Sequence, residues 1–331
     1  MRKMLSRFWR SLPFLLASAA LVHPLAKLGA RHDWRLDLIT HFQELALILS
    51  LLAAASLAFR YRRAAIVMLV LAIFQVEPVF RYEFPWDRAP TNSARPRLRV
   101  LFANVLFENS RYASLIDLIN ESNPDVVAIA EVSDDWVLAL SEIAKAYPYR
   151  MEVPNGPAGL SLWFKKPPIR IDPPDIPCPG GWPFLHATFA FEDQTWNLWL
   201  LHPASPFRRD SSTPGFPELA ALADRIAATP GPTIVVGDLN TTDGSPHFDD
   251  FLAKTRLRDS RRGFGRQPSW PVGSPYQITI DHALISEDVV VVSRSLGSSI
   301  GSDHRPILID FEANGASDAS ARSTSALKSS K

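Results

Sequence analysis

The chain has 331 residues, enough for two domains, and a formal net charge of +1. Its single cysteine, Cys178, excludes an internal disulfide and a cysteine-based zinc site. The net charge hides a division, because residues 1–95 carry 13 Lys and Arg against 6 Asp and Glu, whereas residues 96–312 carry 19 against 27, a net charge of −8. The acidic second part argues against tight nonspecific DNA binding, which depends on many contacts between basic side chains and phosphates.

The first 80 residues predict a membrane region of about three transmembrane helices. Three uncharged apolar stretches carry this prediction: Ser11–Ala26, Leu45–Phe59 and Ala64–Val76. Each is shorter than the ~20 residues that span a bilayer, but Leu38–Gln43 and Pro78–Phe80 can extend the second and the third. The last two helices form a hairpin in the simplest interpretation. A buried soluble helical domain is the alternative, disfavoured because the stretches have almost no amphipathic pattern.

The chain start also resembles a signal peptide, with a small-residue cleavage site at Ala17-Ser18-Ala19. Retention is favoured because the two later apolar stretches would still need a membrane. The positive-inside rule places the basic N-terminus and the turn that contains Arg60, Arg62 and Arg63 in the cytoplasm. Three spans then put residue 81 onward outside, although Lys27, Arg31 and Arg35 favour the opposite orientation.

Residues 81–96 are polar and read as a linker, residues 97–312 as a second domain, and the Ala- and Ser-rich residues 313–331 as a disordered tail. The second domain alternates strand-like and helix-like patterns, which indicates a layered α/β fold. The expected strands are Leu98–Leu106, Asp125–Ala130, Leu160–Phe164, Leu185–Phe191, Trp196–Leu201, Thr233–Val236, Gln277–Ile285, Val289–Val292 and Pro306–Phe311. The expected helices are Tyr112–Asn120, Asp134–Ala146, Glu218–Ala228 and Phe248–Lys254.

Polar side chains stand at the ends of several of these strands. They are Asn104, Glu131, Asp238, Asn240, Asp303 and His304. Each has a structural alternative when taken singly: a turn for Asn104, a helix cap for Glu131, an Asx turn for Asp238 to Asn240. Taken together they supply oxygen ligands for a hard divalent cation and groups that activate water, which are the requirements of phosphoester hydrolysis.

Residues 98–312 resemble the endonuclease/exonuclease/phosphatase superfamily, to which DNase I belongs. The matching motifs are, in chain order, Asn104 in Leu-Phe-Ala-Asn-Val, Glu131 in Ile-Ala-Glu-Val, Gly237-Asp238-Leu239-Asn240, Ile280-Asp281-His282, and Gly301-Ser302-Asp303-His304-Arg305-Pro306. Asn104 alone is a weak signal, but Gly-Asp-Leu-Asn and the final motif are fairly specific together. The resemblance implies a four-layer α/β sandwich of two mixed β-sheets flanked by helices. It also implies Mg²⁺-dependent phosphoester cleavage, with Mn²⁺ as the alternative cation.

The resemblance assigns a role to each matching residue. Glu131 is the principal metal ligand, with Asn104 and Asp303 beside it. Asp238 orients or deprotonates the attacking water, and Asn240 binds the scissile phosphate.

The histidines complete the implied site. His304, polarised by Asp281, stabilises or protonates the phosphoryl group. His202 ends a strand where relatives place His or Tyr against the phosphate, with a structural role as the alternative. His282 is expected to serve packing, and Ser161 receives no role.

Two basic clusters lie outside these motifs. Six basic residues have only Asp259 against them, and a solvated surface loop is the favoured interpretation over a polyanion site: Lys254, Arg256, Arg258, Arg261, Arg262 and Arg266. Arg208 and Arg209, just after the His202 strand, are better candidates for contact with a substrate phosphate.

Three apolar segments followed by this domain resemble the bacterial membrane-anchored branch of the superfamily. We therefore predict a multi-pass enzyme of the bacterial cell membrane, a metal-dependent hydrolase of ester bonds whose catalytic domain lies outside the cytoplasm. Its partners are the lipid bilayer and a phosphate-ester substrate, either nucleic acid or a lipid or isoprenoid phosphate, with no protein partner. The alternatives are a non-catalytic binding or scaffold protein that retains the fold, and a secreted nuclease released by signal-peptide cleavage.

Overall fold

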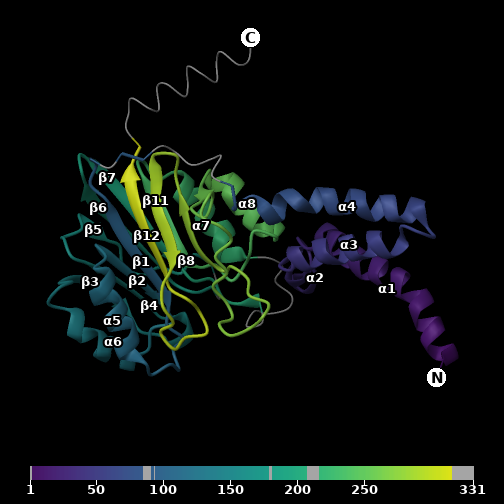
Figure 1. Ribbon diagram of the computed structural model, residues 1–331. Helices are drawn as coiled ribbons and strands as arrows, with labels where there is room; N and C mark the ends of the chain where they lie inside the picture. The colour runs from purple at the N-terminus through teal and green to yellow at the C-terminus, as the bar shows by residue number, and fades with distance from the viewer. Residues whose placement is uncertain (1, 85–90, 93, 179–180, 207–215, 315–331) are drawn as a thin grey trace, which may run out of the picture.

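The computed structural model describes residues 2–84, 91–92, 94–178, 181–206 and 216–314, and side chains from residue 11 onward (Figure 1). Arg208 and Arg209, residues 315–331 of the expected tail, and residues 85–90 and 93 of the expected linker lie outside this part of the chain. The structure consists of a two-sheet domain and a group of N-terminal helices that projects from one side of it (Figure 1).

The N-terminal region contains α1 (Arg2–Gly29), α2 (Trp34–Thr40), α3 (Gln43–Leu57) and α4 (Arg62–Phe80). Within α1 and α4, Ser11–Gly29 and Arg62–Phe80 are long and apolar enough to cross a membrane, and the bent pair of α2 and α3 would be a third span if counted as one. The α3–α4 hairpin is observed. The loop that joins α3 to α4 lies far from the sheets, and so does the N-terminal end of α1 (Figure 1).

Leu38–Gln43, the expected extension of the second apolar stretch, does not continue α3 as one straight helix. Leu38 to Thr40 belong to α2, whose axis is bent by 67° from that of α3, and Gln43 is the first residue of α3. Phe42 lies between them with φ −105° and ψ 45°, outside helical geometry. Asp33 caps the start of α2 by accepting a hydrogen bond from the backbone N–H of Arg35, 2.8 Å away. A separate helix therefore begins there.

The second domain is an α/β sandwich of two mixed sheets, as expected. One has the strand order β11-β12-β1-β2-β4-β3, the other β5-β6-β7-β8-β10-β9. The strands are β1 (Leu98–Asn104), β2 (Val126–Ala130), β3 (Tyr149–Val153), β4 (Leu160–Phe164), β5 (Arg170–Ile171), β6 (Phe184–Phe191), β7 (Gln194–Leu201), β8 (Thr233–Asp238), β9 (Arg258–Asp259), β10 (Asp281–Ile285), β11 (Val289–Leu296) and β12 (Ile307–Ala313). The pairs β1–β2 and β7–β8 are parallel, and the other pairs are antiparallel.

Alternating apolar residues of both sheets form a shared core, in which Phe102, Leu162, Trp196 and Val236 are buried. The outer face of the first sheet is covered by α5 (Tyr112–Ser122) and α6 (Asp134–Leu140), and that of the second by α7 (Pro217–Ala227) and α8 (Pro246–Thr255). Short 3-10 turns follow at 141–143 and 156–158. Helix, sheet, sheet and helix layers give the four-layer arrangement (Figure 1).

Three strands were not expected from the sequence. The edge strand β3 is partly exposed and carries polar residues, so it shows no apolar run. The strands β5 and β9 have two residues each. One expected strand is shorter than predicted. β10 begins at Asp281 instead of Gln277, because Ile278 lies outside the sheet and forms an isolated bridge with Trp270. That departure places Ile278 at the site described below.

The N-terminal helices are held against the second domain by buried polar contacts. Gln43 Nε2 donates to Asp243 Oδ2 at 2.8 Å, and Ser245 Oγ donates to Asp37 Oδ1 at 2.6 Å. A Cβ on Gly244 would collide with the carbonyl oxygen of Thr40, so only glycine allows this close approach. The C-terminal end of α2 is therefore fixed directly beside the loop between β8 and α8.

Candidate active site

Sheet topology explains why residues far apart in the chain meet at one edge. Asn104 pairs with Ala130 in the parallel β1–β2 ladder, and Leu201 pairs with Gly237 in the parallel β7–β8 ladder. The residues that end these strands therefore face the same edge. β12 is antiparallel to β1, so the loop before β12, which carries Asp303 and His304, returns to that edge.

Close packing at this edge imposes special backbone geometry. A Cβ on Gly237 would collide with the carbonyl oxygen of Leu201, so β8 can approach β7 only with glycine there. Glu131 and Asn240 adopt left-handed backbone conformations, with φ 62° and 52°. Such conformations cost free energy in residues other than glycine, and they occur here at two of the expected site residues.

His304 is held between two carboxylates. Its Nδ1 lies 2.9 Å from Asp281 Oδ2, and its Nε2 lies 3.7 Å from Asp238 Oδ2. Ser302 supports the loop, since its hydroxyl donates to the carbonyl oxygen of Asn104 at 2.8 Å and accepts from the backbone N–H of His304 at 3.0 Å. Burial alone would lower the pKa of His304, but Asp281 and Asp238 raise it above its ordinary value. The imidazole is therefore a cationic donor that points toward Asp238.

Asp238 is buried and its pKa is raised, chiefly by burial, with the His304 cation acting in the opposite direction. Asn104 connects it to Glu131, because Asn104 Nδ2 lies 3.0 Å from Asp238 Oδ2 and 3.1 Å from Glu131 Oε1. Burial likewise raises the pKa of Glu131, against hydrogen bonds from Asn104 and the backbone N–H of Phe107. Asn104 thus presents its amide nitrogen, not its oxygen, to the carboxylates.

Asp303 is fixed on one side only. Its Oδ2 accepts a hydrogen bond from Trp270 Nε1 at 2.9 Å, while its Oδ1 is covered, lies 3.9 Å from His304 Nε2 and has no hydrogen-bond partner among the described residues. A covered carboxylate oxygen without a donor, near the half-buried Glu131, has the chemistry of a hard-cation site. The residues present therefore fit a divalent cation.

A second acidic group is also available to a cation. Ligand atoms of Asp238, Asp281 and His304 lie within 4.8 Å of one another, and all three residues are buried. His304 could bind a cation only after it loses a proton, and the two carboxylates favour the protonated imidazole. Glu131 with Asp303 is for this reason the better position.

Asn240 and His202 complete the side of the site formed by the second sheet. Asn240 receives its position from two hydrogen bonds: its backbone N–H donates to Asp238 Oδ1, and its Nδ2 donates to the carbonyl oxygen of Pro203, both at 2.9 Å. His202 Nε2 lies 3.6 Å from Asp238 Oδ2 and 4.0 Å from Glu131 Oε1. The expected residues from both sheets thus come together.

Six of the expected site residues line a cavity of about 360 Å³: Glu131, His202, Asp238, Asn240, Asp303 and His304. Three of its lining residues, Leu38, His41 and Phe42, come from α2 and the bend before α3. The sequence analysis did not assign them to the site. The available signal was the presence of Asp37, Thr40, His41 and Gln43 in an otherwise apolar region, because a simple membrane-spanning helix does not need these polar side chains.

Other candidate residues lie elsewhere. His282 is buried, with Nε2 2.9 Å from the carbonyl oxygen of Thr241 and its ring against Phe248, which agrees with a packing role. Ser161 accepts a hydrogen bond from Trp163 Nε1 inside the core.

The expected solvated loop of basic residues is wrong in part. Arg261 is 1% exposed, and its Nη2 lies 2.7 Å from Asp259 Oδ2 and 3.2 Å from Asp243 Oδ1. Its guanidinium also lies over the ring of Tyr82, which follows α4. Arg266 forms an ion pair with Glu44 of α3 at 2.6 Å. Two of the six basic residues therefore attach the N-terminal helices to the second domain.

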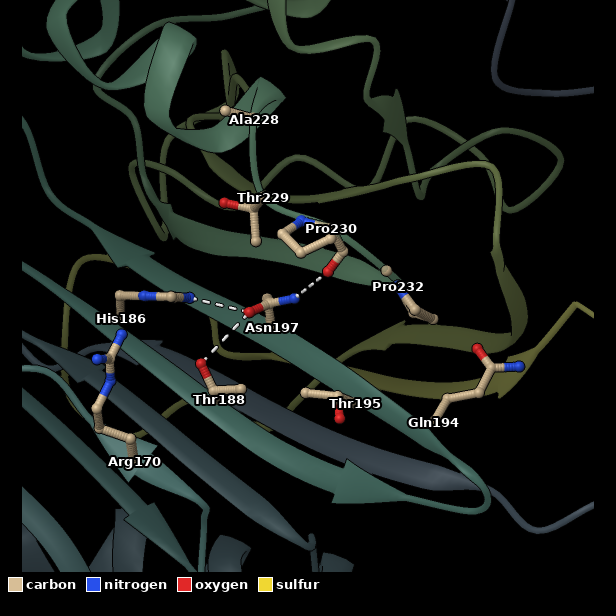
Figure 2. Close-up of a pocket in the computed structure, with 11 residues that line it drawn as sticks. Arg170, His186, Thr188, Gln194, Thr195, Asn197, Ala228, Thr229, Pro230 and Pro232 are labelled. Atoms are coloured by element: carbon tan, nitrogen blue, oxygen red, sulfur yellow. Dashed lines mark hydrogen bonds between the residues drawn. The ribbon is translucent and has the colours of Figure 1, made fainter.

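A larger cavity, of about 660 Å³, lies at the opposite end of β7 and contains no expected site residue (Figure 2). His186 Nε2 lies 3.2 Å from Asn197 Oδ1, and Asn197 donates to the carbonyl oxygen of Pro230 (Figure 2). On its other side, His186 Nδ1 lies 2.7 Å from Asp172 Oδ2. Both ring nitrogens of His186 have protein partners. This His–Asp pair is therefore a structural counterpart of the His304–Asp281 pair.

Two packed mixed sheets with polar residues gathered at one edge define the DNase I-like class of α/β sandwiches. The model of the Endonuclease/Exonuclease/phosphatase family matches residues 101–304, and the chain belongs to this family. Members of the family act on phosphoester bonds. No curated protein matches the sequence.

Solved structures are similar over the same part of the chain. D. rerio TDP2 complexed with single strand DNA product has 20% identity and a TM-score of 0.53, covering 65% of this chain and 99% of that one. An endonuclease/exonuclease/phosphatase family protein from Leptotrichia buccalis has 14% identity and a TM-score of 0.52, with coverage of 65% and 99%. The family protein from Bacteroides vulgatus has 17% identity and a TM-score of 0.52, with coverage of 66% and 100%. At these identities the likeness concerns the fold.

Proposed function

We propose that the protein is a membrane-anchored phosphoesterase that depends on a divalent cation, Mg²⁺ by preference and Mn²⁺ as the alternative. The observation that carries the proposal is the position of His304. It lies between Asp281 and Asp238, in a cavity that Glu131 and Asp303 also line. A buried cationic donor, a carboxylate of raised pKa and a cation position within one cavity are the parts that hydrolysis of a phosphate ester requires.

The proposed roles follow from the geometry. Glu131 and Asp303 hold the cation, and Asn104 orients Glu131 through its amide nitrogen. When bound, the cation neutralises charge on the phosphoryl oxygens. Asp238 accepts a proton from water, since its raised pKa suits a general base near neutral pH.

His304 and the two side chains of the second sheet act on the phosphate itself. His304 donates from Nε2 to a phosphoryl oxygen while Asp281 fixes Nδ1. Asn240 keeps one amide hydrogen available after its bond to Pro203, and His202 is close enough to contact the same phosphate.

Membrane anchoring is supported by the two helices that are long and apolar enough to cross a bilayer. Their exposed side chains include Leu25, Leu28, Ile66, Ile73 and Phe74. The turn with Arg60, Arg62 and Arg63 lies at the end of α3 and α4 that is far from the sheets (Figure 1). The proposal therefore retains a multi-pass arrangement with the catalytic domain outside the cytoplasm.

The test uses the full chain in detergent with Mg²⁺, against a soluble phosphomonoester, a soluble phosphodiester and single-stranded DNA. The DNA arm is included because a structural relative holds a single strand DNA product. Glu131→Gln should lower kcat/KM by at least about 10²-fold, since an amide removes the anionic oxygen that Mg²⁺ prefers. Glu152→Gln, a change of the same kind on the edge strand β3, is the matched control. Activity of Glu131→Gln within about threefold of wild type at saturating Mg²⁺ would contradict the metal assignment.

A further inference from the structure

An apolar groove among the N-terminal helices adjoins the catalytic cavity. It has a volume of about 350 Å³, and α1, α2 and α3 form its walls. Its lining residues are Ala19, Val22, His23, Leu38, Ile39, Phe42, Leu45, Ala46 and Leu49. Leu38 and Phe42 line both the groove and the catalytic cavity, so the two spaces meet at the bend between α2 and α3.

The groove is suited to hydrocarbon along its whole length. Among the residues that the structure describes, His23 is the only polar one that lines the groove, and His23 Nε2 lies 3.2 Å from the carbonyl oxygen of Thr40. From Phe42 to Leu49 the wall formed by α3 extends on the order of 10 Å, at 1.5 Å per helical residue. Ala19 and Val22 lie within the segment of α1 that is long and apolar enough to cross a membrane. A hydrocarbon chain in the bilayer could therefore enter the groove from the side.

A buried polar side chain, His41, lies where the catalytic cavity meets the apolar groove. His41 is buried and lines the catalytic cavity, and His41 Nε2 has no hydrogen-bond partner among the described residues. Its nearest carboxylate oxygen, Asp37 Oδ2, is 3.7 Å away. A polar donor or acceptor stands there directly before the apolar groove begins, as a ligand with a polar head and an apolar tail would require.

From these observations we propose that the substrate is a lipid phosphate ester of the bilayer, with its phosphate beside Glu131 and His304 and its hydrocarbon chain in the groove between α1, α2 and α3. The inference rests on the proposed function and names the class of its substrate. A segment of the chain itself is a poor occupant, because residues 315–331 contain a single large apolar residue, Leu327. A membrane lipid is also the occupant that spanning helices meet at high local concentration.

The experiment compares the hydrolysis of a dodecyl and a butyl phosphate ester that share a chromogenic leaving group, by the full chain in lipid nanodiscs. Ala19→Trp narrows the groove at an exposed position of α1, so the fold should be preserved. Ala55→Trp makes the same change at an exposed position of α3 that does not line the groove. Comparison of the two variants removes the effect of partitioning of the dodecyl ester into the bilayer, because partitioning is the same for both.

Wild type should have a higher kcat/KM for the dodecyl ester than for the butyl ester. Ala19→Trp should lower this ratio at least about tenfold, and Ala55→Trp should leave it within about twofold of wild type. Dodecyl phosphonate should inhibit butyl ester hydrolysis at least about tenfold less tightly in Ala19→Trp than in Ala55→Trp, which reports on binding of the chain without its turnover.

The outcomes separate the two proposals. Hydrolysis of both esters with the same kcat/KM, or a ratio that Ala19→Trp does not change, would overturn the lipid inference and leave the phosphoesterase proposal standing. Faster hydrolysis of single-stranded DNA than of the dodecyl ester would do the same. Failure of wild type to hydrolyse any of these phosphate esters with Mg²⁺ would overturn the phosphoesterase proposal itself.

Discussion

Replacement of Asp281 by Asn tests whether His304 acts as one unit with its carboxylate. The two side chains are buried, with His304 Nδ1 2.9 Å from Asp281 Oδ2. A hydrogen bond to a charged group contributes about 1.5–3 kcal/mol, which corresponds to a loss of about 10- to 150-fold in rate if the bond supports the transition state. Asp281→Asn should therefore lower kcat/KM by about 10²-fold. His304→Ala should cost on the order of 10²–10⁴-fold, as expected for a lost acid–base group.

The decisive measurement is the double variant. If Asp281 acts only through His304, then Asp281→Ala combined with His304→Ala should be little worse than His304→Ala alone. The assay is kcat/KM for a soluble chromogenic phosphodiester at saturating Mg²⁺, with folding checked by thermal unfolding.

The chain itself offers a matched control. Asp172 and His186 form a second His–Asp pair, with Oδ2 and Nδ1 2.7 Å apart, and His186 lines the far cavity. Asp172→Asn should leave kcat/KM within about twofold of wild type. Strictly multiplicative losses at Asp281 and His304 would refute the reasoning, and the role of Asp281 would then have to be withdrawn.

Three further outcomes are expected. Asp303→Asn should raise the Mg²⁺ concentration for half-maximal activity at least about tenfold while keeping the contact with Trp270, and an unchanged metal dependence would remove Asp303 from the cation site. Alkaline phosphatase fused after residue 314 should be active in a bacterial host, whereas activity only of a reporter that works in the cytoplasm would mean that the orientation is inverted. Arg261→Met should lower the free energy of unfolding by about 3–5 kcal/mol, since it leaves the Asp243 and Asp259 carboxylates buried without their cation. Burial raises the pKa of both carboxyls, but Arg261 holds both below the ordinary value in wild type. Both pKa values should therefore rise in the variant, so the difference from wild type should be complete only above those raised values and should decline as pH falls below them. Urea unfolding of both proteins at several pH values checks this, and a difference independent of pH would argue against the ion pairs.

Most strands of the second domain were predictable because their apolar runs are long and end at polar clusters. The run Leu160–Phe164 matches β4 at both ends, since all five side chains are buried. The edge strand β3 was not predictable, because an exposed strand lacks such a run. The convergence of Asn104 and Glu131 with Asp238 was expected from their positions at strand ends, but the orientation of the Asn104 amide toward two carboxylates follows only from their positions in space.

In the N-terminal region, the sequence predicted the long helices but not the contacts of the short helix α2. Its apolar stretches identify the long helices, because a spanning helix is recognisable from length and composition alone. The apolar pattern does not explain the polar residues of α2 and of the start of α3. Asp37 accepts its hydrogen bond from Ser245, more than 200 positions away, and Gln43 reaches Asp243 in the same way.

The sequence by itself determined the family, the layered α/β fold and the identity of the polar residues that gather at one sheet edge, because these depend on local apolar patterns and short motifs. The tertiary structure alone decided that Arg261 is buried and that Leu38, His41 and Phe42 form a wall of the catalytic cavity. Both results depend on contacts between segments that are distant in the chain. A local sequence pattern does not predict which surface the end of a helix will contact.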